Sequence, residues 1–291
     1  MIKTNGIEDV SYLKRSTITM TIYAYQTWPE LEERLKTTKT VLFPVGSVEQ
    51  HGHHIGVGAD YIQADAIAHR VGEKCGALVL PTLCYGVSGH HKEFTGTLTL
   101  STETYTQLVY EILESLARYG VKRVVFMNGH GGNNTGLTLA AKRARDDFGM
   151  LCAICTWWDI LHNEKVLGHP AEQHAGYAET SFTLASKPEA VRMDLASCMA
   201  TKQLDTDIQL TRAGLARYKN GMVRIPLQTA DVTDVGSMTE AHPDDYPSVY
   251  DYSRVTPEFA EALMEKVVDW MCSFMKDFDE MKYPEWSIRR P

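Results

Sequence analysis

A short stretch after an apolar run carries side chains of the types that bind divalent metals. Residues 46–60 contain Glu49, His51, His53, His54 and Asp60, and the apolar residues 40–45 before them are typical of a buried strand. Glu49 and His51 are two positions apart, so an extended backbone would direct both side chains the same way. Carboxylate and imidazole groups that converge at a strand end suit Zn, Mn, Fe or Co. The alternative interpretation is a solvated, His-rich loop.

Two further polar clusters follow in the chain. The motif N-G-H-G-G-N over residues 128–133 comes directly after an apolar run, and its glycines let the backbone around His130 approach a ligand or metal closely. The motif H-A-G-Y-A-E-T-S over residues 174–181 precedes an apolar helical face. Taken alone, Glu179 would be a first-turn carboxylate that the helix dipole favours.

Helical and strand patterns alternate along the first two thirds of the chain. They predict helices over 27–36, 60–74, 101–119, 134–148 and 177–185, and strands over 40–45, 77–81, 121–127 and 150–157. This alternation predicts an α/β fold with a mostly parallel sheet that is covered on both faces. Ligands bind at the carboxyl ends of strands in such folds, and the first two clusters both fall there.

The rest of the chain is less patterned. Residues 204–250 are predicted to hold most of the loop character, with Asp and Thr scattered between short apolar pieces, and residues 257–275 are predicted to form a final amphipathic helix. No linker or internal repeat divides the sequence. We therefore predict a single domain over residues 1–291, with an N-terminal extension at 1–25 and a tail at 276–291 that contains Tyr283 and Trp286.

Charge and composition exclude several classes of protein. The net charge of −8 and the pI near 5.8 argue against binding to the phosphate backbone of nucleic acids. No apolar run approaches the roughly 18 residues of a membrane span, and the start shows no secretory signal. A cytoplasmic protein is expected. Cys152 and Cys155 match C-x-x-C, but they lie in a predicted strand whose alternation would turn them to opposite faces, so we interpret them as buried structural thiols.

Together these motifs resemble the creatininase (creatinine amidohydrolase) family. The resemblance runs in order from about residue 24 to residue 185, and more loosely to about residue 275. It includes S-G-H-H-K-E-F-T-G-T over residues 88–97, where Thr95 stands in place of a family proline. It implies a three-layer αβα sandwich, creatininase-like, and a binuclear metal-dependent hydrolase.

The resemblance also implies roles for particular residues. Two divalent ions per chain (Zn, Mn or Fe) would be bridged by Asp60, and a metal-bound hydroxide would attack a substrate carbonyl. His174 would be the proton shuttle, because an imidazole takes and returns a proton near neutral pH. The implied metal ligands are Glu49, His51, Asp60, His130 and Glu179; the implied catalytic residues are His174 and Glu179, and the implied substrate-binding residues are Ser88, His91 and Trp158.

Two positions depart from creatininase itself. Creatininase carries a Glu metal ligand two residues after the His of the second motif, where this chain has Gly132. A Trp that creatininase places four residues before its catalytic His is Pro170 here, which leaves Trp158 alone to cover the substrate. We therefore expect a family member other than creatininase.

The expected activity is amidohydrolase-type attack on a small cyclic or polar substrate. One alternative is a C–C hydrolase that opens a cyclic diketone such as a diketo-inositol in inositol catabolism (3-dehydro-scyllo-inosose hydrolase-like), and another is a non-catalytic metal-binding regulator. Arg212, Arg217 and Arg224 are candidates for substrate contacts, against the simpler interpretation as surface charges. The resemblance implies a homo-oligomer, a hexamer. From charge and the lack of a long apolar run we expect no nucleic-acid or membrane partners.

Overall fold

A parallel four-stranded sheet lies at the centre of the computed structural model, which describes residues 21–163, 172–197, 199–212, 214–239 and 252–282. Its strands are β1 (Thr40–Val45), β2 (Leu78–Val79), β3 (Arg123–Asn128) and β4 (Leu151–Cys155), in the order β2-β1-β3-β4. β1 pairs with β3 over its full length, and all six of its residues are buried. Because β1 is buried on both faces, its sequence is a nearly continuous run of apolar residues.

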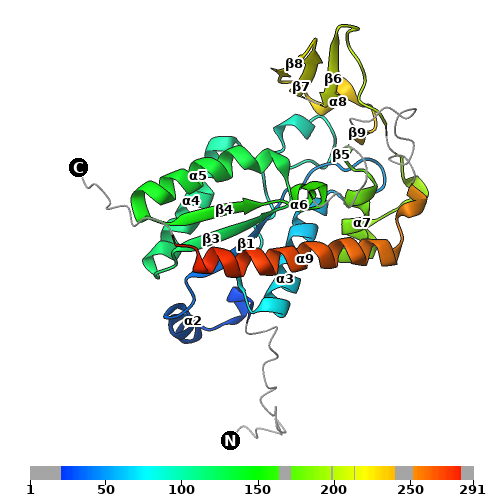
Figure 1. Cartoon of the computed structure of the whole chain (residues 1–291). Helices are drawn as coiled ribbons and strands as arrows, with labels where there is room; N and C mark the ends of the chain where they lie inside the picture. Colours follow the sequence, from blue (N-terminus) through cyan, green and yellow to red (C-terminus); the bar gives the residue numbers. More distant parts are fainter. Residues whose placement is uncertain (1–20, 164–171, 198, 213, 240–251, 283–291) are drawn as a thin grey trace, which may run out of the picture.

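Helices cover both faces of this sheet (Figure 1). One face packs α3 (Ala59–Cys75), α6 (Trp157–Asn163), α7 (Tyr177–Ser186) and α9 (Pro257–Glu280) in a core with Leu42, Val125 and Met127. The other face packs α2 (Trp28–Leu35), α4 (Thr102–Arg118) and α5 (Asn134–Phe148) in a second core with Val41, Phe43, Val124 and Phe126. Alternate strand residues thus enter opposite cores. The predicted three-layer αβα sandwich is confirmed.

Local signals set the helix ends. The Ser101 hydroxyl accepts a hydrogen bond from the Thr104 N–H at 3.1 Å, which caps α4. Gly76 and Gly149 end α3 and α5 with φ angles of 77° and 66°, a left-handed conformation that glycine adopts without steric cost. Some boundaries differ from prediction. The strand expected over 150–157 ends at Cys155 because Trp157 begins α6, and the last helix continues beyond Met275 to Glu280.

The C-x-x-C pair is structural, as predicted. Cys155 packs in the core beneath α9, and Cys152 packs against the core beneath α4 and α5, so the two thiols face opposite sides of β4. Burial raises the pKa of both thiols to about 12. Neither thiol is therefore activated for redox chemistry.

The loop character predicted for residues 204–250 holds only in part, because the portion that the structure describes, up to residue 239, also contains a small antiparallel sheet. β6 (Ile208–Arg212), β7 (Gly214–Tyr218) and β8 (Gly221–Ile225) form an antiparallel sheet, followed by α8 (Thr229–Val232), and β9 (Met238–Thr239) pairs with β5 (Glu172–His174). These strands are short, and their small core contains only a few apolar side chains, such as Leu210 and Ala216. Short strands with so little apolar surface give a weak periodic signal.

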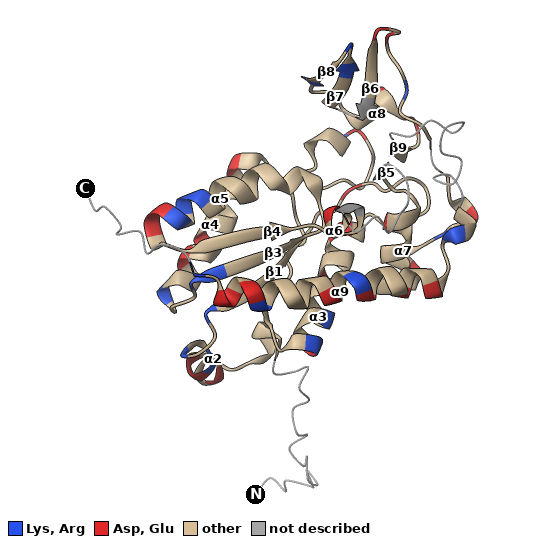
Figure 2. Ribbon diagram, in the orientation of Figure 1, with Lys and Arg blue, Asp and Glu red and all other residues tan. Residues whose placement is uncertain are grey.

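Acidic residues, most of them exposed, occur along α2 and α9 (Figure 2), in keeping with the negative net charge. Arg217 and Arg224 are exposed on β7 and β8, which supports their interpretation as surface charges; the side chain of Arg212 lies outside the described set. Pro170, Tyr283 and Trp286 also lie outside the described residues. None of the described helices is both long and apolar enough to cross a membrane.

Candidate metal centre

The polar clusters meet at the carboxyl edge of the central sheet. β1 and β3 end side by side, with Val45 paired to Asn128, so the segments 46–58 and 129–133 leave the sheet together. α3 begins directly after the first segment, and β5 ends at His174, just ahead of α7. Side chains of the first cluster come within ligand spacing of His130 in the second cluster and of His174 and Glu179 in the third. The two clusters expected at the strand ends therefore do lie together, and the third cluster joins them.

Two glycines let the first turn of α3 lie directly on the strand ends. A Cβ atom at Gly46 would lie 2.3 Å from the backbone nitrogen of Tyr61, and one at Gly129 would lie 2.2 Å from the carbonyl oxygen of Asp60. Either side chain would force α3 away from the sheet. Because positions 46 and 129 have no side chain, α3 packs close to the strand ends and Asp60 reaches the sheet edge from its first turn.

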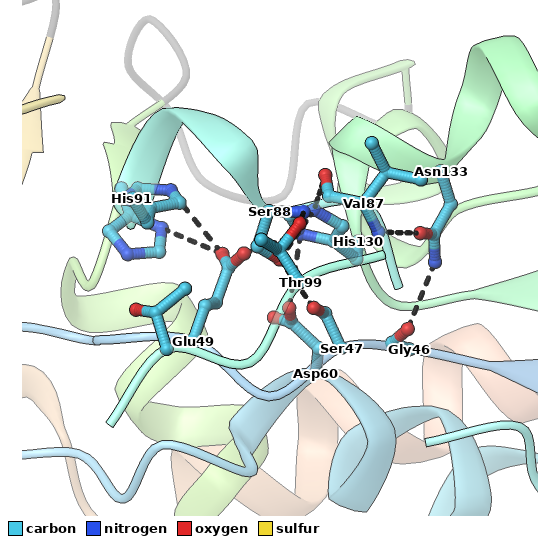
Figure 3. Close-up of polar contacts among 12 residues, drawn as sticks. Gly46, Ser47, Glu49, Asp60, Val87, Ser88, His91, Thr99, His130 and Asn133 are labelled. Carbon is cyan, nitrogen blue, oxygen red and sulfur yellow. Dashed lines mark hydrogen bonds and ion pairs between the residues drawn. The ribbon is translucent and has the colours of Figure 1, made fainter. Parts of the chain in front are cut away.

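Asparagines hold the loops around the site, a role that the sequence analysis missed. The Asn128 side chain accepts a hydrogen bond from the His130 N–H at 3.2 Å and donates one to the His130 carbonyl at 2.8 Å. Asn133 donates to the Gly46 carbonyl and accepts from the Val87 N–H, both at 3.0 Å (Figure 3). Their signal in the sequence was only their position at the two ends of the glycine-rich motif.

Glu49, Asp60 and His130 form a first group with metal-ligand spacing. The His130 Nδ1 atom lies 3.2 Å from Glu49 Oε2 and 3.1 Å from Asp60 Oδ2 (Figure 3). Both of these carboxylate oxygens are buried and accept no hydrogen bond within the described chain. Buried anionic oxygens without hydrogen bonds are costly unless a cation neutralises them, and a divalent ion does so.

A second group consists of His51, Asp60 and Glu179. The His51 Nε2 atom lies 3.0 Å from Asp60 Oδ1 and 3.5 Å from Glu179 Oε1. The two groups thus share Asp60 but use different oxygens of its carboxylate. A carboxylate that offers one oxygen to each of two neighbouring groups is suited to bridge two ions.

Backbone carbonyls orient the histidines of the cluster. His51 Nδ1–H donates to the Glu49 carbonyl at 3.1 Å, His130 Nε2–H donates to the Val87 carbonyl at 3.0 Å, and His174 Nε2–H donates to the Gln50 carbonyl at 2.6 Å. In each ring the other nitrogen faces the carboxylates. Metal-binding histidines characteristically donate their second N–H to a carbonyl or carboxylate, which fixes the tautomer and the ring orientation.

The cluster is buried, so its charges are strongly coupled. Glu49, Asp60 and His51 are at most 1% exposed. Burial alone would lower the pKa of His51 and His130, but the carboxylates outweigh it, chiefly Asp60 for His51 and Glu49 for His130, and raise both pKa values well above the ordinary value. Burial would raise the pKa of Glu179, but His51 opposite lowers it to about 2. The neighbouring histidines thus favour the ionised form of Glu49, Asp60 and Glu179, and because the cluster is buried, the solvated-loop interpretation is wrong.

The predicted substrate-binding residues fall in three different settings. His91 is buried and its Nε2 atom lies 3.4 Å from Glu49 Oε1. The Ser88 hydroxyl is hydrogen-bonded to Ser47 and lies 3.3 Å from His130 Nε2, so it sits behind the His130 ring. Trp158 is half-buried in the first turn of α6, edge-on to Trp157. Substrate contacts for these residues stay a prediction.

His54 is a further site residue that the sequence analysis did not single out. Its Nε2–H donates to the Thr180 hydroxyl at 3.0 Å, and that hydroxyl donates to the Gly176 carbonyl at 2.6 Å. Thr180 follows Glu179 in the first turn of α7, so His54 ties this turn to the loop that carries the first ligands. The only signal of His54 in the sequence is its place as the third histidine of the motif.

Fold and site together define a class: three-layer αβα proteins with a carboxylate–histidine cluster, suited to divalent metal ions, at the carboxyl edge of a parallel sheet. Residues 24–275 match the creatininase family, described as creatinine amidohydrolase. The chain belongs to the creatininase family, whose members are hydrolases, as the sequence motifs predicted.

Individual relatives agree with this assignment. The chain is 38% identical to the creatinine amidohydrolase of Pseudomonas putida over 191 residues, which cover 58% of this chain and 72% of that protein. It is 34% identical to the mycofactocin precursor peptide peptidase of Mycolicibacterium smegmatis over 184 residues, which cover 60% and 68% of the two chains. A solved creatininase structure matches with a TM-score of 0.71 at 25% identity, over 91% of this chain and 99% of that chain.

Proposed function

We propose that this protein is a binuclear metal-dependent hydrolase that attacks the carbonyl group of a small cyclic or polar substrate. The observation that carries the proposal is the pair of ligand groups, Glu49–Asp60–His130 and His51–Asp60–Glu179, that share one bridging carboxylate. Solved relatives described as Zn–Zn and Mn forms of creatininase agree with divalent ions as the cofactor. Two bound ions would activate water and hold the charge that develops on the substrate oxygen.

His174 has the geometry of the proton shuttle. Because its Nε2–H donates to the Gln50 carbonyl, the lone pair of Nδ1 faces the centre, 3.9 Å from Glu49 Oε1 and 4.0 Å from Glu179 Oε2. From there it can accept a proton from water held between the carboxylates and return it to the leaving group. The same atom also completes a ligand-spaced group with Glu49 and His51, so metal binding is the competing role.

The residue at position 132 separates this site from that of creatininase. A Cβ atom at Gly132 would lie 2.1 Å from the Val87 carbonyl oxygen and 2.4 Å from His130 Nε2. A Glu side chain therefore has no room here while Val87 holds His130. At position 132 creatininase has a metal-binding Glu, and at position 170 it has a Trp that covers the substrate, but this chain has Gly132 and Pro170. These two differences support a substrate other than creatinine.

The decisive experiment combines metal analysis with a substrate screen. The purified, metal-loaded protein should contain two divalent ions per chain and should hydrolyse a compact amide or a cyclic carbonyl compound faster than creatinine. The names of the relatives justify including short peptides and 3-dehydro-scyllo-inosose in the screen. At most one ion per chain would contradict the binuclear centre, and creatinine as the best substrate would contradict the specificity argument. Metal binding without any hydrolysis would favour a non-catalytic regulator.

A further inference from the structure

A fourth histidine, His91, also faces the centre, but its donor and acceptor nitrogens are arranged the other way round from those of the other three. His51, His130 and His174 each donate one ring N–H to a backbone carbonyl and turn the other nitrogen to the carboxylates. His91 also has one nitrogen toward the centre, Nε2, at 3.4 Å from Glu49 Oε1. Its second nitrogen, Nδ1, contacts the Gln50 side-chain amide instead of a carbonyl, at 2.9 Å.

The surroundings of Gln50 determine which way its amide points. Its oxygen accepts a hydrogen bond from the Gly52 N–H at 2.9 Å, and its nitrogen lies 3.1 Å from the Gly236 carbonyl. Reversing the amide would place an N–H against an N–H and an oxygen against an oxygen, so only one orientation is satisfied. The amide therefore presents its second N–H to His91 Nδ1, which must accept.

The tautomer of His91 follows from this. A neutral imidazole that accepts at Nδ1 carries its proton on Nε2. The ring thus turns an N–H toward Glu49 Oε1, which is attractive, whereas a lone pair at the same place would repel the carboxylate. The other oxygen of this carboxylate, Oε2, is the one that faces His130 Nδ1 and accepts no hydrogen bond among the described residues. His91 therefore acts on one oxygen of Glu49 while the other faces the first ligand group.

We propose that Gln50 is a positioning residue that fixes His91 as an N–H donor, so that His91 orients Glu49 toward the ion held with Asp60 and His130. The inference rests on the proposed binuclear centre. Hydrogen bonds to ligating carboxylates support metal affinity. Loss of a residue that donates such a hydrogen bond typically lowers metal affinity or activity by about 10–100-fold. His91 then supports the centre through Glu49 and is not itself a ligand.

Gly236 connects this arrangement to the segment between α8 and β9. A Cβ atom there would lie 1.8 Å from Gln50 Oε1, and its φ of 82° is a left-handed conformation. Gly236→Ala should therefore displace the Gln50 amide. Gly214→Ala is the matched control, because Gly214 has a φ of 86° in a nearby strand but a Cβ atom there would meet nothing closer than 3.7 Å.

The test is a zinc titration in competition with a chromogenic chelator. His91→Gln keeps an amide N–H where Nε2 lies, whereas His91→Met has similar length but no donor. We expect His91→Met and Gln50→Met each to lower the binding affinity for one of the two zinc ions by about 10–100-fold. His91→Gln should keep most of that affinity. Gln50→Met should have no added effect in the His91→Gln background, since an amide turns freely to donate. Gly236→Ala should lose affinity and Gly214→Ala should not.

The outcomes separate this inference from the proposed function. A wild-type protein that binds fewer than two zinc ions would overturn the binuclear centre and this inference with it. Two tightly bound ions in the wild type, with unchanged affinity in both Met variants, would overturn the inference alone. Equal losses in His91→Gln and His91→Met would also overturn it, because they would show that ring packing matters and the N–H does not.

Discussion

Asp60 lies in both of the ligand-spaced groups on which the proposed binuclear centre rests, Glu49–Asp60–His130 and His51–Asp60–Glu179. We predict that Asp60→Asn loses more metal than the same type of change at any other ligand position, since an amide offers one neutral oxygen in place of two anionic ones. Elemental analysis of metal-loaded protein measures this. Asp65→Asn is the control on the same helix, because Asp65 is partly exposed and bonds to Thr82. Full metal content in Asp60→Asn would contradict the bridging role.

His174 offers a second prediction at the residue scale. His174→Ala should lower kcat by about 10²–10⁴-fold, the usual contribution of a positioned acid–base group, and should leave the metal content unchanged. Parallel kinetic and metal measurements check both parts, with His69→Ala on the outer surface of α3 as control. Loss of an ion in His174→Ala would instead make His174 a ligand, the competing role that its spacing from Glu49 and His51 permits.

The candidate ligands were predictable from the sequence because residue type and motif position carried the information. Glu49, His51 and Asp60 lie within a dozen residues, and His130 stands between glycines after a strand. Their supporting partners were not predictable in the same way. The Val87 carbonyl that orients His130 comes from a distant loop, and backbone carbonyls leave no mark in residue types.

At the scale of elements, the contact between the end of β3 and the start of α3 yields a third prediction. Gly129→Ala should destabilise the protein by about 1–3 kcal/mol, as overpacking does, because its Cβ would overlap the Asp60 carbonyl. It should also reduce metal content, since α3 carries Asp60. Thermal unfolding and elemental analysis of the same samples measure both effects.

Gly131→Ala is the matched control for that change. A Cβ atom at Gly131 meets nothing within 4 Å, and neither glycine has a positive φ. We expect Gly131→Ala to unfold close to the wild-type temperature with its metal retained. Equal destabilisation in both variants would mean that loop flexibility, and not the helix–strand contact, explains the glycines.

The central sheet and its helices other than α6 followed from periodicity because each element buries one face or both. The antiparallel sheet did not, since β8 is mostly exposed and gives no apolar alternation. β2 was also predicted longer than the two paired residues it has. Elements held by a few tertiary contacts are thus the ones that a local pattern misses.

At the scale of the whole molecule, we predict a homo-oligomer, with a hexamer as the expected state. The exposed side chains of Tyr218, Met222 and Val223 lie on β7 and β8, and β8 is an edge strand that can pair with another chain. Light scattering coupled to size-exclusion chromatography measures the mass directly. A monomer at micromolar concentration would contradict this prediction.

The strand order has a consequence for synthesis on the ribosome. β1 lies between β2 and β3, but it pairs with β2 at only two positions and with β3 at six. A nascent chain that has reached β2 therefore holds an apolar strand with most of its backbone still unpaired, because parallel partners need long crossovers. Glu49, His51 and Asp60 are synthesised early, but His130 follows only after β3, and Glu179 is synthesised later still, with α7. The complete set of candidate ligands is therefore available only after α7 has been synthesised, while the core on that face of the sheet still lacks α9.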